Sequence, residues 1–349
     1  MSELQDLFIT SITNEGLISA LTSTVFIILI GYFLRKKDIL PEATGTVLSQ
    51  VLLKVALPAL VIRAFMSDIN QEQLSTGIGV VIFGFIIYIA LIFISPLLYS
   101  KYEGDKKTTL SIITIFGSTQ FFGMPIVESI YGSEGLIYAN LFNIAYRVFL
   151  YSYAYIVMSG EKFERKDLGK NLKSIFSNII IIVTIVGFLI WTLQPILPQV
   201  TVDGSQYPFL RIDQTAPWLF KPIDYLANLA SPLAWLTIGT QLAKLDIKDA
   251  FSNKDAWFYA FNKQLIVPLI TMIGVIILGV TNILPITPVA FSVMVVLMAA
   301  PTSNTAATYA LSFDRESYLA SNATFLSSIL SILIIPLWVV ITEVVLALV

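Results

Sequence analysis

The feature that most constrains this chain is a series of long apolar stretches that recur along its whole length. A helix needs about 20 mostly apolar residues to cross the hydrocarbon core of a bilayer. Hydrophobic residues make up 56% of the 349 residues and charged residues only 13%, so too little polar surface is available to enclose the apolar part in water. We therefore predict an all-α membrane protein with ten transmembrane helices. The expected spans lie at 16–34, 43–66, 77–99, 108–131, 135–158, 178–198, 222–245, 257–280, 287–311 and 319–345.

Lysine and arginine residues gather in alternate loops between these spans. The odd-numbered loops hold 15 of them, whereas the even-numbered loops and both tails together hold two, Arg211 and Lys221. Loops rich in basic residues remain on the cytoplasmic side of a membrane. The pattern therefore predicts a multi-pass protein of the plasma membrane with both termini extracellular.

The two halves of the chain show a faint internal repeat. Pro58 and Pro232 lie 174 residues apart, and Pro125 and Pro301 lie 176 residues apart. Because five is an odd number, a second five-helix copy enters the membrane from the opposite face, as in many secondary transporters. The alternative is coincidence, since proline is common in membrane helices. We expect two inverted repeats joined by a basic cytoplasmic linker, at 1–158, 159–177 and 178–349 respectively.

Polar residues and helix breakers interrupt two corresponding spans. The fourth span contains GSTQFFGMPIVESIYG, and the ninth contains AAPTSNTAAT. A proline within a span removes one backbone donor and clashes with the preceding turn, and the freed backbone groups cannot face lipid. We predict that both helices are broken and cross at a polar substrate site; the alternative is a proline kink whose hydroxyls bond back to their own helix. The expected site residues at the breaks are Ser118, Thr119, Gln120, Gly123, Pro125, Pro301, Thr302, Ser303, Asn304 and Thr305.

The expected site also includes two cations deep within spans, Arg147 and Lys54. A charge at that depth costs at least about 2.5–3.5 kcal/mol, so its presence indicates a function. Half-helix N-termini suit an anionic group, and a guanidinium suits bidentate contact with a carboxylate. Asn143 lies four residues before Arg147 and Asn140 three residues before Asn143, so the two amides complete a polar face. The alternatives are a structural pairing of Arg147 with a carbonyl, and snorkelling of Lys54.

Several classes of function are excluded by residues that the chain lacks. It has no cysteine and no histidine, so we predict no metal site, no cofactor and no enzyme activity of the usual nucleophilic or metal-dependent kinds. A net charge of −2 predicts no nucleic-acid partner. The acidic residues within spans lie toward the outer ends, which does not favour a carboxylate proton relay. The coupling ion stays open between none, Na⁺ and H⁺.

Several motifs, taken in order, resemble those of the auxin efflux carrier family. GSTQFFGMPIVESIYG is similar to the fourth-span pattern N-x-x-F-x-G-x-P, matched by Phe121, Gly123 and Pro125, whereas Ser118 stands where the family has asparagine. The resemblance extends over essentially the whole chain, through LLKVALPALVIRAF, LASPLAWLTIGTQLA and FDRESYLASNATFLSSILSILIIPL.

The resemblance implies a fold and a substrate class. It implies ten helices in two inverted five-helix repeats, with a scaffold of spans 1, 2, 6 and 7. The remaining spans would form a transport unit that moves in an elevator-like manner, with crossover helices 4 and 9. It also implies a homodimer formed through the scaffold and a home in a bacterial plasma membrane. Prokaryotic members are described as malate or malonate permeases and plant members export auxin, so a small carboxylate substrate is implied.

We therefore predict a secondary transporter that moves a small organic anion by alternating access, with a malate-like dicarboxylate favoured. An anion channel or a solute-sensing membrane protein of the same fold is one alternative. A carrier for an auxin-like hydrophobic monocarboxylate is another.

Overall fold

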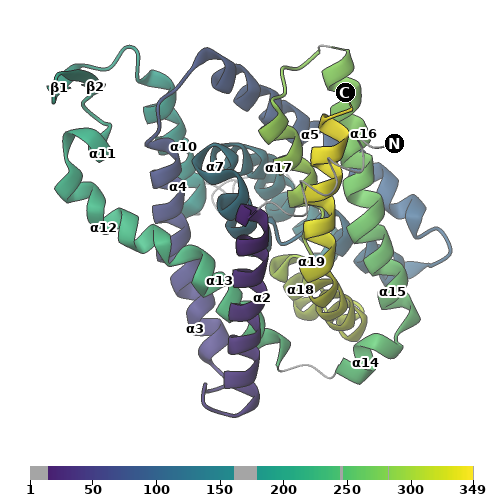
Figure 1. The fold of residues 1–349 in the computed structure, drawn as a ribbon. Helices are drawn as coiled ribbons and strands as arrows, with labels where there is room; N and C mark the ends of the chain where they lie inside the picture. The colour runs from purple at the N-terminus through teal and green to yellow at the C-terminus, as the bar shows by residue number, and fades with distance from the viewer. Residues whose placement is uncertain (1–14, 161–178, 244–246, 282, 349) are drawn as a thin grey trace.

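The structure is a computed structural model, and it describes residues 15–160, 179–243, 247–281 and 283–348. Most of the expected linker at 159–177 lies outside the described residues, as do the first 14 residues. The chain is almost entirely helical (Figure 1). In its first half the helices are α2 Glu15–Lys36, α3 Thr44–Val51, α4 Leu57–Phe65, α5 Gln71–Leu98, α6 Gly104–Ile115, α7 Met124–Phe149 and α8 Tyr155–Ser159. In its second half they are α10 Ile179–Leu193, α11 Ile212–Thr215, α12 Pro217–Asn228, α13 Ala230–Leu242, α14 Ile247–Ser252, α15 Lys254–Phe261, α16 Val267–Val280, α17 Pro288–Met298, α18 Asn304–Ser312 and α19 Ser317–Leu346.

Five helical segments within the described residues are long and apolar enough to cross a membrane. They are Thr44–Phe65, Gln71–Leu98, Thr119–Ser159, Lys254–Gly279 and Ser317–Leu346, with shorter apolar helices at Ile179–Leu193 and Pro288–Met298. The expected fourth and fifth spans are joined in one segment, whereas the expected seventh and ninth are divided between α12 and α13 and between α17 and α18. Gly132, with φ +59° and ψ −148°, interrupts the longest segment between the expected fourth and fifth spans. These observations support an all-α membrane protein.

Four short π-helical segments interrupt the helices within the described residues: η1 Leu52–Ala56, η2 Thr119–Gly123, η3 Leu150–Ala154 and η4 Asn262–Ile266. Three of them end two residues before a proline, at Pro58, Pro125 and Pro268. A proline ring clashes with the carbonyl of the fourth residue before it, and a wider turn moves that carbonyl away. Such π-bulges occur frequently at functional sites.

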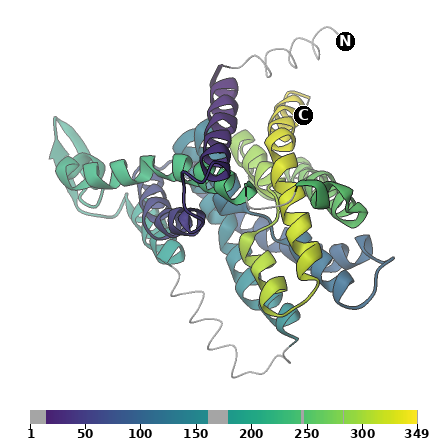
Figure 2. The ribbon, with the colours of Figure 1, turned by 90° about the horizontal axis from the view of Figure 1, so that it is seen from below.

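The helices pack in two groups. We call α2, α3, α4, α10, α12 and α13 the first helix group, because α13 packs on α2 and α3 while α4 packs on α10 and α12. The second helix group contains α5, α6, α7 and α15 to α19, in which α7 packs on α5 and α17, and α19 packs on α15 and α17. Figure 2 shows α12 and its neighbours extending away from the second helix group. Helices α4 and α2 also contact α7, which joins the two groups.

A β-hairpin precedes α11 in the expected loop between the sixth and seventh spans. Strand β1, Gln199–Val202, pairs antiparallel with β2, Ser205–Pro208. Asp203 and Gly204 both have positive φ, as a tight two-residue hairpin turn requires. The apolar pattern predicted only a loop at this position.

Candidate functional site

The two helix breaks expected from the sequence lie side by side. Helix α6 ends at Ile115 and η2 begins at Thr119, while α17 ends at Met298 and α18 begins at Asn304. The extended residues between them form an isolated antiparallel bridge. The bridge pairs Gly117 with Thr302. The Ser118 N–H donates to the Pro301 carbonyl at 2.6 Å, and the Ser303 N–H donates to the Phe116 carbonyl at 3.0 Å. Backbone groups that helix breaking frees are thus satisfied by the other break.

Buried side chains hold the paired breaks in place. The Tyr146 hydroxyl donates to Ser303 Oγ at 2.8 Å, and the Thr119 hydroxyl donates to Asn143 Oδ1 at 2.6 Å. Tyr259 Oη lies 2.5 Å from Thr302 Oγ1. Because the breaks are fixed from several helices, their geometry is well defined for a bound ligand.

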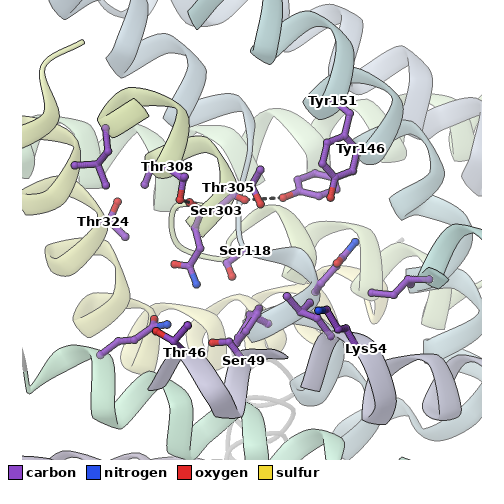
Figure 3. Close-up of a pocket in the computed structure, with 18 of the residues that line it drawn as sticks. Thr46, Ser49, Lys54, Ser118, Tyr146, Tyr151, Ser303, Thr305, Thr308 and Thr324 are labelled. Carbon is purple, nitrogen blue, oxygen red and sulfur yellow. Dashed lines mark hydrogen bonds between the residues drawn. The ribbon is translucent and has the colours of Figure 1, made fainter. Parts of the chain in front are cut away.

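A cavity of about 880 Å³ lies against the two breaks, between the two helix groups (Figure 3). Its size is within the range of small-molecule sites. Thr46, Ser49 and Lys54 line it from the first helix group and face Ser118 and Ser303 of the breaks. The other lining residues are Leu53, Gln120, Phe121, Tyr146, Tyr151, Ile179, Ile180, Gln241, Asn304, Thr305, Ala307, Thr308, Leu311, Ser321 and Thr324.

Two helix N-termini meet this cavity without a side-chain cap. Ser118 precedes η2 and Ser303 precedes α18, and neither serine side chain accepts a bond from its own helix. The first N–H groups of a helix have no partner within it, and the helix dipole adds positive potential there. Since Gln120, Asn304 and Thr305 of these first turns line the cavity, both ends present positive potential to a ligand.

Lys54 is the only charged side chain among the described residues that line the cavity. It lies in η1 and is solvent-exposed. The cavity therefore combines one exposed cation, two helix N-termini and many hydroxyl and amide groups, and this chemistry suits an anion.

Arg147 does not line the cavity but lies behind it. Its side chain is fully buried in α7. With the Gln120 amide oriented so that its oxygen faces the guanidinium, that oxygen accepts bonds from Arg147 Nε at 2.8 Å and Nη2 at 3.0 Å. Arg147 thus fixes the Gln120 side chain, which does reach the cavity.

The expected site residues fall into two sets. Lys54, Ser118, Gln120, Ser303, Asn304 and Thr305 line the cavity. Thr119, Gly123, Pro125, Asn140, Asn143, Arg147, Pro301 and Thr302 are buried and do not line the cavity. Gly123 packs tightly beneath the first break, because a Cβ there would lie 2.5 Å from Leu297 Cδ2 of α17. The Asn140 amide donates to the carbonyl of Leu136 in its own helix, at 2.8 Å.

Sequence reasoning missed several lining residues that lie far from the breaks. They include Thr46 and Ser49 of α3, which are three residues apart, and Ser321 of α19, which lies three residues before Thr324. That spacing puts each pair on one helix face, and polar pairs on an apolar helix were the signal that could have found them. Tyr151 lies in η3, and no proline follows that segment to indicate an interrupted helix in the sequence.

An ion-pair network joins the two helix groups at another position. Arg63 of α4 contacts Glu128 of α7 and lies 3.2 Å from Asp224 of α12. Arg63 Nη1 also donates to Asn228 Oδ1 at 2.5 Å, and the Ser231 hydroxyl donates to Glu128 Oε2 at 2.9 Å. We call these five residues the Arg63 network. The expected topology assigns them to the ends of spans next to even-numbered loops, whereas the cavity residues Thr46 and Ser49 lie next to an odd-numbered loop.

Comparisons with known proteins match the chain over nearly its full length. A family model described as membrane transport protein matches residues 17–339. An uncharacterized transporter of Methanothermobacter thermautotrophicus is 25% identical over 336 residues, which cover 93% of this chain and 98% of the relative. An uncharacterized transporter of Methanocaldococcus jannaschii is 20% identical over 326 residues, which cover 90% of this chain and 95% of the relative. The resemblance found in the sequence motifs is confirmed, and the chain belongs to the auxin efflux carrier family of membrane transport proteins.

Proposed function

We propose that this protein is a secondary transporter that carries a small organic anion across the membrane by alternating access. The observation that carries the proposal is the meeting of two uncapped helix N-termini with Lys54 at one cavity. Positive potential from both sources favours a bound anion. No acidic side chain lines the cavity among the described residues, so nothing there opposes that potential.

The proposed substrate is a dicarboxylate of the size of malate. One lysine and two helix ends offer positive potential at more than one point of the cavity, which suits two carboxylates better than one. The hydroxyl and amide groups of Ser49, Gln120 and Thr305 suit the polar body of such a molecule. A hydrophobic monocarboxylate would leave these groups without hydrogen-bond partners.

The proposed architecture has ten spans in two inverted repeats, 1–158 and 178–349, with both termini outside. The first helix group corresponds to the scaffold and the second to the unit that moves. With that orientation, the cavity opens toward the cytoplasm and the Arg63 network closes the outer side. An elevator-like movement of the second group, in a homodimer held by the scaffold, completes the proposal.

The test is counterflow of radiolabelled malate in proteoliposomes, competed by a panel of mono- and dicarboxylates. We expect saturable uptake that dicarboxylates block more strongly than monocarboxylates. Lys54→Ala should raise the half-saturation concentration about tenfold or more, because a hydrogen bond to a charged group is worth about 1.5–3 kcal/mol. Lys54→Arg, which keeps the charge, is the matched control. Uptake without saturation, or equal affinity in Lys54→Ala and the parent, would refute the proposal.

A further inference from the structure

Lys263 is a buried cation that the proposed substrate site does not use. Its side chain is fully buried in η4. Within the part of the chain that the structure describes, its Nζ has no hydrogen-bond partner, and it takes part in none of the ion pairs found there. A buried ammonium is costly unless its surroundings stabilise the charge, so its position needs a physical account.

The Lys263 ammonium lies at the paired breaks. A Cβ added to Gly117 would be 2.8 Å from Lys263 Nζ and 3.1 Å from the Ala300 carbonyl oxygen. Gly117 belongs to the first break and Ala300 to the second. The lysine side chain therefore reaches the point where the two breaks meet, and the absence of a side chain at Gly117 leaves room for it.

Both helices that approach this point end there. Helix α6 ends at Ile115 and α17 ends at Met298. The last carbonyl groups of a helix are unpaired within it, and the dipole adds negative potential at that end. Two such ends brought together repel one another unless a positive charge lies between them.

Other polar groups at the breaks carry oxygen atoms of the kind that coordinate hard metal cations. Tyr259 donates to the Ile113 carbonyl of α6 at 3.1 Å and contacts Thr302. Ser327 Oγ accepts from the Thr302 N–H at 3.3 Å. Carbonyl and hydroxyl oxygens are typical ligands of hard metal cations, yet here the positive charge comes from the chain itself.

We propose that the Lys263 ammonium is a resident counter-cation for the paired C-terminal ends of α6 and α17, where it stands in for a bound monovalent metal ion. The Lys263 proposal deepens the proposed function, because it identifies the charge that stabilises the helix crossing. Of the tests below, only the transport measurements rest on the proposed function. The parent should need no Na⁺ for stability, whereas removing the ammonium should leave a vacancy that a small cation can fill.

The first measurement is thermal unfolding of purified Lys263→Ala at constant ionic strength, with choline replaced stepwise by Na⁺, K⁺ or methylammonium. We expect a lower Tm than the parent in choline and a saturable rise with at least one small cation, because a ligand that binds only the folded state stabilises it. The parent and Lys37→Ala, which removes an exposed lysine, should show no such rise. A saturable Na⁺ response in the parent would overturn the proposal, as would a Lys263→Ala Tm equal to that of the parent in every salt.

A second pair of variants covers the case in which Lys263→Ala does not fold. Lys263→Arg keeps the charge, and Lys263→Met keeps the length of the side chain without it. We expect the arginine variant to be recovered as folded protein in at least threefold higher yield than the methionine variant. Equal yields would overturn a role for the charge.

Transport measurements separate this proposal from the proposed function. We expect parent uptake to be equal in Na⁺ and choline, and Lys263→Ala uptake to be at least tenfold slower and restored severalfold by methylammonium. Parent uptake that requires Na⁺ would overturn the Lys263 proposal and leave anion transport intact. If small cations stabilise Lys263→Ala but the parent carries no organic anion, the proposed function is overturned and the Lys263 proposal stands.

Discussion

At the scale of single residues, three cationic side chains differ in their burial and in their place in the fold. Lys54 lines the cavity and is exposed, Arg147 is buried behind Gln120, and Lys263 is buried at the paired breaks. Only the first is positioned to meet a ligand directly. The second acts through a neighbouring amide, which makes it a positioning residue.

The role of Arg147 can be tested with a double-mutant cycle. Arg147→Ala and Gln120→Ala should each weaken malate binding about tenfold, since each removes the same pair of charge-assisted bonds. The double variant should be no weaker than either single one, because the two residues act as a unit. Binding is measured by isothermal titration calorimetry on protein shown to be folded by its size-exclusion profile. Losses that add in the double variant would mean that Arg147 contacts the anion independently.

At the scale of elements, proline and glycine decide where helices break and how closely they pack. Pro125 lies two residues after the end of η2, and the Pro301 carbonyl accepts the Ser118 N–H across the bridge. In the first helix group, α2 and α13 approach so closely that a Cβ on Gly239 would lie 2.1 Å from the Ile28 carbonyl oxygen. Small residues permit such close helix packing in membranes.

The prolines are predicted to keep the breaks open. Pro125→Ala and Pro301→Ala each remove a helix-breaking residue that costs about 3 kcal/mol in a helix interior, so both helices should become more regular. We expect slower transport in both variants with folding retained, measured as initial uptake rates into proteoliposomes. Pro222→Ala, in α12 outside the breaks, is the control. Parent-like rates in both break variants would show that helix regularity does not limit transport.

The α2–α13 packing predicts a large and specific loss of stability. Gly239→Ala should destabilise the protein by about 1–3 kcal/mol, because overpacking forces the backbones apart. Gly279→Ala is the matched control, since a Cβ in that position of α16 has no atom within 4 Å, and it should be neutral or stabilise by up to about 1 kcal/mol. Thermal unfolding of the two variants checks the difference. If both variants unfold at the same temperature, the close packing carries no stability.

At the scale of the whole molecule, the two helix groups meet at the cavity and at the Arg63 network. The cavity separates the groups near Lys54, while Arg63 of the first group holds Glu128 of the second. A transporter that is closed on one side and open on the other has this distribution of contacts. In the proposed alternating-access mechanism, the network would act as a latch, and we expect its loss to shift the population toward the opposite state.

The latch can be tested by thiol labelling, because the chain contains no cysteine. Thr308→Cys places one thiol at the cavity, to be labelled from the cytoplasmic side by a membrane-impermeant maleimide. Adding Glu128→Gln should shift the equilibrium constant away from the cytoplasm-open state roughly fivefold and so slow labelling, since a partly exposed ion pair contributes about 1 kcal/mol. Glu134→Gln in the same helix should have no effect. Equal labelling in all three proteins would mean that the Arg63 network does not set the equilibrium.

The class of protein follows from the amino-acid sequence alone, because long apolar stretches leave no soluble alternative. The same holds for the family and the chemical character of the breaks, because proline, glycine and hydroxyl residues act through local backbone geometry. These properties depend on residues close together in the chain. Lys54, Ser118 and Asn304 were therefore found as candidates before their surroundings were known.

Which of these residues come into contact depends on how the helices pack in three dimensions. The pairing of Gly117 with Thr302, the burial of Arg147 behind Gln120 and the approach of Lys263 to Gly117 all join residues on different elements. A charged residue within an apolar helix looks the same in sequence whether it faces a ligand, a neighbouring amide or a helix end. Its role depends on helix packing, which local periodicity does not specify.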